Sequence, residues 1–71
     1  MMTSEQLFLF KKLIKDWETF YELDDNLAEK KEAAINLIKF VNKHNPECSY
    51  LDRKSIMNAR FYVHLNKIAV V

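Results

Sequence analysis

The chain has 71 residues, of which 11 are basic and 10 are acidic, so its formal net charge is +1. A chain of this length forms one domain and buries only about 60% of the surface that its unfolded form exposes, which gives marginal stability. Small proteins are commonly stabilised further by disulfides, metals or association. The single cysteine cannot form an intrachain disulfide. We therefore expect a homo-oligomer, or docking on another molecule.

The composition also excludes several classes of function. Because glycine is absent, the chain has neither a Walker phosphate loop nor a dinucleotide-binding fingerprint. No apolar run reaches the roughly 18 residues of a membrane span, and the first residues lack the features of a signal peptide, so we expect a cytoplasmic protein. The soft metal ligands His44, Cys48 and His64 are not spaced as zinc pairs. We predict no metal, no cofactor and no enzymatic activity, since no catalytic motif is present.

The first predicted helix covers residues 4–23. Thr3 and Gln6 fit a capping box, in which each side chain accepts a hydrogen bond from the backbone of the other residue. Charged residues lie opposite an apolar stripe, although Phe8 falls on the polar side as an exposed ring or an oligomer contact. The stripe has helical spacing and predicts a core face. Its members are Leu9, Phe10, Leu13, Ile14, Trp17, Phe20 and Tyr21.

The second predicted helix covers residues 26–44. Asn26, with Glu29 three residues later, is a candidate N-cap. Lys30 interrupts the apolar stripe and either extends along the surface to water or points into a polar pocket. Asn45, able to adopt a left-handed conformation, precedes the proline that ends the helix. The apolar side consists of Leu27, Ala34, Leu37, Ile38 and Val41.

The third predicted helix covers residues 50–69 and begins after Ser49, which has Asp52 three residues later. No strand pattern and no internal repeat is present in the sequence. Tight connections between the three helices favour antiparallel neighbours. The sequence therefore predicts an all-α fold, a small three-helix domain covering residues 1–71.

The third helix carries two apolar faces. Met57, Phe61, Leu65 and Ile68 cluster at about 100° per residue, and we predict that this face enters the intramolecular core. A second line lies more than a quarter turn away. It is either a second side of the core or an oligomer interface, in which the small alanine permits close approach. Its members are Ile56, Ala59 and Val63.

Between these two faces lie Arg53, Arg60 and Lys67. They are seven residues apart and therefore lie on one line of a helix. This basic line is either a solvated surface or a phosphate-binding stripe, because cations on one line match the charge of a phosphodiester.

Two segments resemble a known family. KKEAAINLIKFV (30–41) and KSIMNARFYVHLNKIA (54–69) are similar to the helical-hairpin domain of phage anti-CBASS sponge proteins, which sequester cyclic oligonucleotide immune signals. The pattern differs at Lys31 and Arg60, where the family has glycine. The resemblance implies a compact helical oligomer without catalytic activity, with ligand pockets between subunits formed by basic and aromatic side chains.

The resemblance predicts a cyclic di- or trinucleotide as the ligand. Such a ligand needs cations for its phosphates and aromatic faces for its bases. By resemblance we carry over Lys30, Lys54 and Ser55. We add Arg53 and Arg60 from the basic line, and Tyr21 as a stacking face.

Two other functions remain open. The first is a phage or mobile-element regulator that inhibits a host protein through the second apolar face. The second is a helix-turn-helix protein whose last helix lies in the major groove of DNA. The near-zero net charge argues against duplex DNA. For a phage protein, the expected location is the cytoplasm of the host cell.

Overall fold

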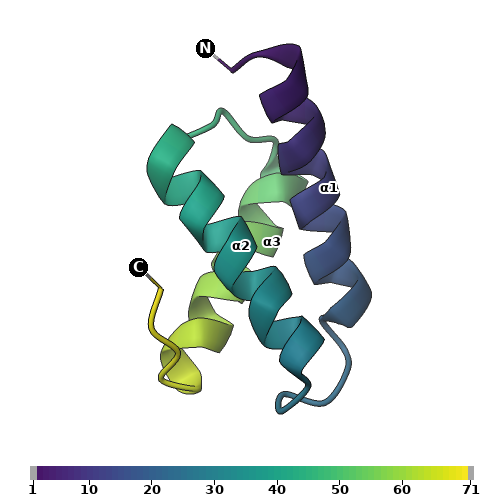
Figure 1. The fold of residues 1–71 in the computed structure, drawn as a ribbon, viewed down its shortest axis with the longest axis vertical. Helices are drawn as coiled ribbons and strands as arrows, with labels where there is room; N and C mark the ends of the chain where they lie inside the picture. The colour runs from purple at the N-terminus through teal and green to yellow at the C-terminus, as the bar shows by residue number, and fades with distance from the viewer. Residues whose placement is uncertain (1, 71) are drawn as a thin grey trace.

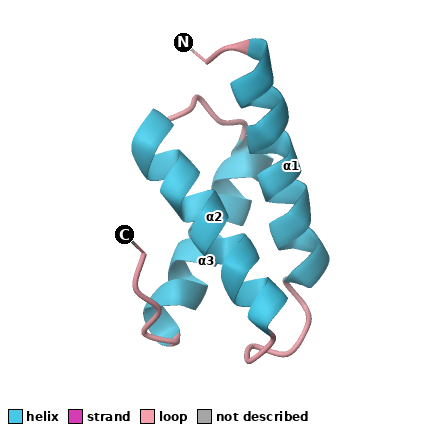
Figure 2. Cartoon of the chain, in the orientation of Figure 1, coloured by secondary structure: helices cyan, strands magenta, loops and turns pink. Residues whose placement is uncertain are grey.

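The computed structural model describes residues 2–70 and contains three α-helices in which consecutive helices are antiparallel (Figure 1). These are α1 (Ser4–Phe20), α2 (Ala28–His44) and α3 (Tyr50–Leu65). Figure 2 shows helices joined by loops, with no strand among the described residues. The predicted all-α, three-helix fold is confirmed. None of the helices in the described part is both long enough and apolar enough to cross a membrane.

Two of the predicted helix starts form as expected. The Thr3 hydroxyl accepts a hydrogen bond from the Gln6 amide at 3.1 Å, and the Thr3 amide donates to the Gln6 side chain at 2.9 Å. At α3, the Ser49 hydroxyl accepts from the Asp52 amide at 3.2 Å. The predicted stop of α2 is also confirmed, because Asn45 adopts the left-handed conformation with φ 43°.

Three predicted boundaries need correction. The helices end at Phe20 rather than residue 23 and at Leu65 rather than residue 69, and α2 begins two residues later than predicted. Asn26 does not cap α2, because the N-cap position is Leu27, which makes no side-chain cap hydrogen bond. The backbone amide of Asn26 instead donates to the Asp24 carboxylate at 2.9 Å in a local turn. After α3, Lys67 adopts φ 53°, and the Ile68 amide donates to the Val63 carbonyl, which is a Schellman motif.

The core lies between the three helices and is closed by aromatic contacts. The Phe10 and Phe40 rings stack with centroids 5.6 Å apart, and the Trp17 and Tyr62 rings are 5.3 Å apart. The buried apolar side chains are Phe10, Ile14 and Trp17 of α1, Ala33, Ala34, Leu37, Ile38 and Phe40 of α2, and Ile56, Ala59 and Tyr62 of α3.

The structure overturns the prediction for the first face of α3 and, for the second line, selects the core over the oligomer interface. Ile56 and Ala59 are 7% and 0% exposed and belong to the core, with Val63 packed against it, so they do not form an exterior oligomer interface. The predicted core face lies on the surface, where Phe61 is 63% exposed. The physical reason is that helices approach closely where side chains are small. Ala59 of α3 and Ala34 of α2 are both fully buried.

Candidate functional site

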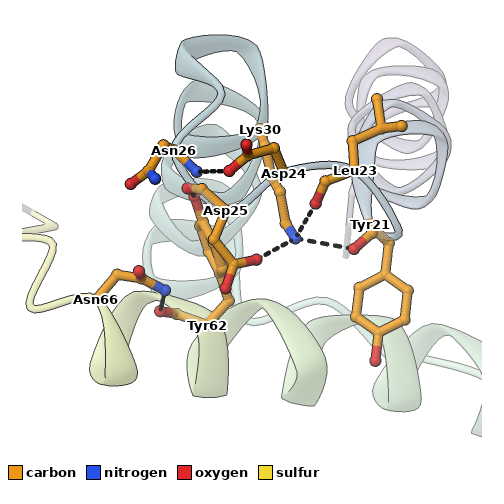
Figure 3. Close-up of polar contacts among 8 residues, drawn as sticks. All are labelled: Tyr21, Leu23, Asp24, Asp25, Asn26, Lys30, Tyr62 and Asn66. Carbon is orange, nitrogen blue, oxygen red and sulfur yellow. Dashed lines mark hydrogen bonds and ion pairs between the residues drawn. The ribbon is translucent and has the colours of Figure 1, made fainter.

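Lys30 occupies a polar cage at the turn between α1 and α2 (Figure 3). Its ammonium donates to the Tyr21 carbonyl at 2.9 Å, to the Leu23 carbonyl at 3.0 Å and to the Asp25 carboxylate at 2.7 Å. A lysine has three such donors, so all of them are used inside the chain. The side chain points into a polar pocket, which is one of the two alternatives drawn from the sequence.

Aromatic rings form the walls of this cage. The Lys30 ammonium lies 4.9 Å from the centroid of the Tyr62 ring and 5.9 Å from the rings of Trp17 and Tyr21, which adds cation–π attraction. The Tyr62 hydroxyl donates to the Asp25 carbonyl at 2.8 Å. Burial raises the pKa of Tyr62 above 10.0, and the nearby Asp25 and Asp24 carboxylates raise it further. Tyr62 therefore stays neutral and keeps its hydroxyl proton as a donor.

The cage corrects the expected role of Lys30. The residue is only 4% exposed and its three donors are occupied, so it is not available to a phosphate group. Ser55 is also buried, and its hydroxyl donates to the Glu18 carboxylate at 3.4 Å. Both residues hold elements of the fold together.

The remaining candidates lie in two separate grooves. Tyr21, Lys54 and Ser55 line one groove of about 490 Å³ between α1 and α3. The same groove is lined by Glu18 and Glu22, and these two carboxylates outnumber its single lysine. Because like charges repel, this groove is a poor site for an anion.

Arg53 and Arg60 line a different groove of about 610 Å³ between α3 and the linker that follows α2. Seven residues separate them on α3, so they lie on the same side of the helix. Glu47 also borders the groove, so the charged side chains give it a net positive charge. The rest of the lining is mainly apolar: Val41, Pro46, Cys48, Ile56 and Met57, with Asn45.

Both arginines keep most of their hydrogen-bonding capacity. The Arg60 guanidinium donates to the Asn42 side chain at 3.0 Å, and Arg53 Nε lies 3.5 Å from the Cys48 carbonyl. These are their hydrogen bonds within residues 2–70, and each guanidinium carries five N–H donors. The bond to Asn42 orients Arg60 while leaving its other N–H groups directed to solvent or a ligand.

Two neighbouring groups have limited roles. Lys67 lies beyond the end of α3 in a left-handed turn, so the predicted three-residue basic line is reduced to the two arginines.

Burial raises the pKa of the Cys48 thiol, Asp52 raises it further, and Arg53 partly opposes this. The thiol therefore stays protonated at neutral pH, which disfavours nucleophilic chemistry. The described residues contain no cluster of three potential metal ligands.

The sequence reasoning missed two parts of these sites. Asp25 was not identified as a partner of Lys30, although an acidic residue just before a helix with an isolated lysine in its apolar stripe is a usable signal. The apolar floor of the arginine groove was also missed. The sequence pattern predicts Pro46 only as a helix stop, yet Pro46 also forms part of that floor.

Comparisons with known protein families, with curated proteins and with solved structures find no match to this chain.

Proposed function

We propose that this chain is a non-enzymatic binding protein that sequesters a small anionic ligand of the cyclic oligonucleotide class in the groove lined by Arg53 and Arg60. The observation that carries the proposal is the combination of two exposed guanidinium groups with an apolar floor in one groove. Phosphates pair with arginine by charge-assisted hydrogen bonds. The bases would contact the apolar floor, because none of the residues that line this groove is aromatic. A volume of about 610 Å³ falls within the usual range for small-molecule sites.

The phage setting implied by the resemblance gives this binding a consequence. A protein that holds a cyclic oligonucleotide without cleaving it lowers the free concentration of an immune signal and thereby blocks host defence. Lys54 and Tyr21, predicted as contacts, lie in the other groove beside Glu18 and Glu22. The ligand contacts in this proposal are therefore Arg53 and Arg60.

The test is calorimetric titration with a panel of cyclic di- and trinucleotides. We expect Arg53→Ala and Arg60→Ala each to weaken binding about 10- to 100-fold, because a hydrogen bond to a charged group contributes about 1.5–3 kcal/mol. Lys12→Ala is the matched control, since Lys12 is an exposed cation on α1 outside the groove. The control and Lys54→Ala should leave affinity nearly unchanged.

Two results would overturn this function. If the unmodified protein gives no heat with any nucleotide of the panel, a regulator of a host protein becomes the better hypothesis. If it binds duplex DNA tightly at moderate salt, and Arg53→Ala abolishes that binding, the helix-turn-helix hypothesis replaces it. Duplex binding would show a strong salt dependence, with a slope of roughly −0.9 for each phosphate neutralised.

A further inference from the structure

Helix α3 carries five large exposed apolar side chains, and four of them, all except Leu51, lie along one side of the helix. We call Tyr50, Met57, Phe61 and Leu65 the α3 stripe. They are separated by seven, four and four residues, so they lie along one side of the helix. Tyr50 is the most exposed of the four, at 79%. This is an apolar surface, interrupted by the exposed Lys54 between Tyr50 and Met57, that residues 2–70 do not cover.

Three members of the α3 stripe, together with Lys54, have the spacing of a helix–helix seam, and Leu65 flanks that seam because it follows Phe61 by four residues rather than three. Tyr50, Lys54, Met57 and Phe61 follow one another at four, three and four residues, which is the alternation of a coiled-coil core. Lys54 is the polar member of the seam, and it is exposed. A single lysine at such a position is known to set register and oligomeric state. The partner that this surface fits is therefore another helix with an apolar seam.

We propose that the α3 stripe packs against the α3 stripe of a second copy, with the two helices antiparallel. Four large side chains at the observed exposure offer roughly 500 Å² per copy, against about 800 Å² per partner in a standard interface. The stripe thus supplies most of the apolar centre of a small two-fold interface, and the residues around it complete the area. The pairing goes beyond the proposed ligand binding and does not require a ligand.

Lys54 decides the orientation. A parallel pair places the two Lys54 ammonium groups at the same level of the seam, where two like charges would lose water without gaining partners. An antiparallel pair separates them along the axis and sets each beside the apolar side chains of the other copy. The charged rim favours the parallel orientation. Arg53 and Arg60 border one side of the stripe and Glu18 and Glu22 the other, so a parallel pair sets the arginines of each copy against the glutamates of the other. Because exposed rim pairs contribute little free energy, the placement of Lys54 in the seam decides for the antiparallel orientation.

The first test is analytical ultracentrifugation at high micromolar concentration without nucleotide. We expect the unmodified protein to sediment as a dimer and Phe61→Asp to sediment as a monomer. Phe8→Asp is the matched control, because Phe8 is 74% exposed on α1 and lies outside the stripe, and this variant should remain a dimer. Circular dichroism of all three proteins checks that the helices are retained.

The second test determines the orientation by disulfide formation in a Cys48→Ser background. Met57→Cys, near the middle of the stripe, should cross-link two copies, whereas Tyr50→Cys, at its end, should not. A cross-link at position 50 would overturn the antiparallel arrangement. A monomeric unmodified protein, or a Phe8→Asp variant that dissociates as readily as Phe61→Asp, would overturn the dimer and leave the stripe for a different protein. Because no nucleotide is present, these outcomes are independent of the ligand proposal.

Discussion

The two connections of the bundle lie at opposite ends of the molecule and differ in how their cations are placed (Figure 1). At the α1–α2 turn, Lys30 is buried and donates to two backbone carbonyls and a carboxylate. At the α2–α3 linker, Arg53 and Arg60 are exposed beside an apolar groove, and each makes one hydrogen bond within residues 2–70. One end is closed by its cation, and the other end presents its cations to solvent.

The difference shows why a basic residue in a sequence pattern does not by itself indicate a binding site. A cation is available to a ligand only if the fold leaves its donors unpaired. Lys30 satisfies the carbonyls of Tyr21 and Leu23, which follow the last turn of α1 and would otherwise lack partners. The two arginines do not satisfy carbonyls at the end of a helix. We therefore expect substitutions at the closed end to change stability and those at the open end to change binding.

The largest effect should follow Lys30→Ala. The substitution leaves the part-buried carbonyls of Tyr21 and Leu23 without their charged donor, and we expect the free energy of unfolding to fall by about 2–4 kcal/mol. The Asp25 pair adds little to this, because its carboxylate is 62% exposed. Chemical denaturation of Lys30→Ala and of the exposed Lys12→Ala measures the difference. Lys12→Ala should lie within about 0.5 kcal/mol of the unmodified protein. Equal effects of the two variants would contradict the comparison.

A smaller effect should follow Tyr62→Phe, which removes the hydrogen bond to the Asp25 carbonyl. We expect a loss of about 1–2 kcal/mol at neutral pH. Because burial and the nearby carboxylates raise the pKa of Tyr62 in the folded state, the stabilising contribution is complete below about pH 10 and is lost as pH rises through the folded-state value. Denaturation at several pH values should show the two proteins converging above pH 10. A constant difference up to pH 12 would mean that the hydroxyl does not titrate in this way.

Much of the fold follows from local sequence signals. Thr3, Ser49 and Asn45 act within one turn of their own positions, so short patterns are sufficient to predict them. The exact helix ends depend on competing local bonds, such as the Asn26 amide bonding to Asp24, and these are harder to anticipate. This explains errors of two to four residues at the boundaries while the helices themselves were predicted.

The faces of α3 and the role of Lys30 depend on tertiary packing. Apolar periodicity gave two faces for α3, and the larger side chains of Met57 and Phe61 favoured the wrong one. Close packing instead selected the face with Ala59. The partners of Lys30 include two backbone carbonyls, which have no signature in side-chain patterns. The two arginines line one groove because their seven-residue spacing places them on the same side of α3.

The smallest effects concern two left-handed residues at the two ends, Lys67 after α3 and Asn45 after α2, with φ values of 53° and 43°. Lysine in this conformation costs about 1–2 kcal/mol, whereas asparagine tolerates it better. Glycine removes that strain but increases the entropy of the unfolded chain. We therefore expect Lys67→Gly to raise stability by about 0.5–1 kcal/mol, and Asn45→Gly to raise it less. Thermal unfolding of both variants gives the order. The residue types alone predict the larger gain in stability for Lys67→Gly. A larger gain for Asn45→Gly would contradict this and would place the greater backbone strain after α2, at the open end.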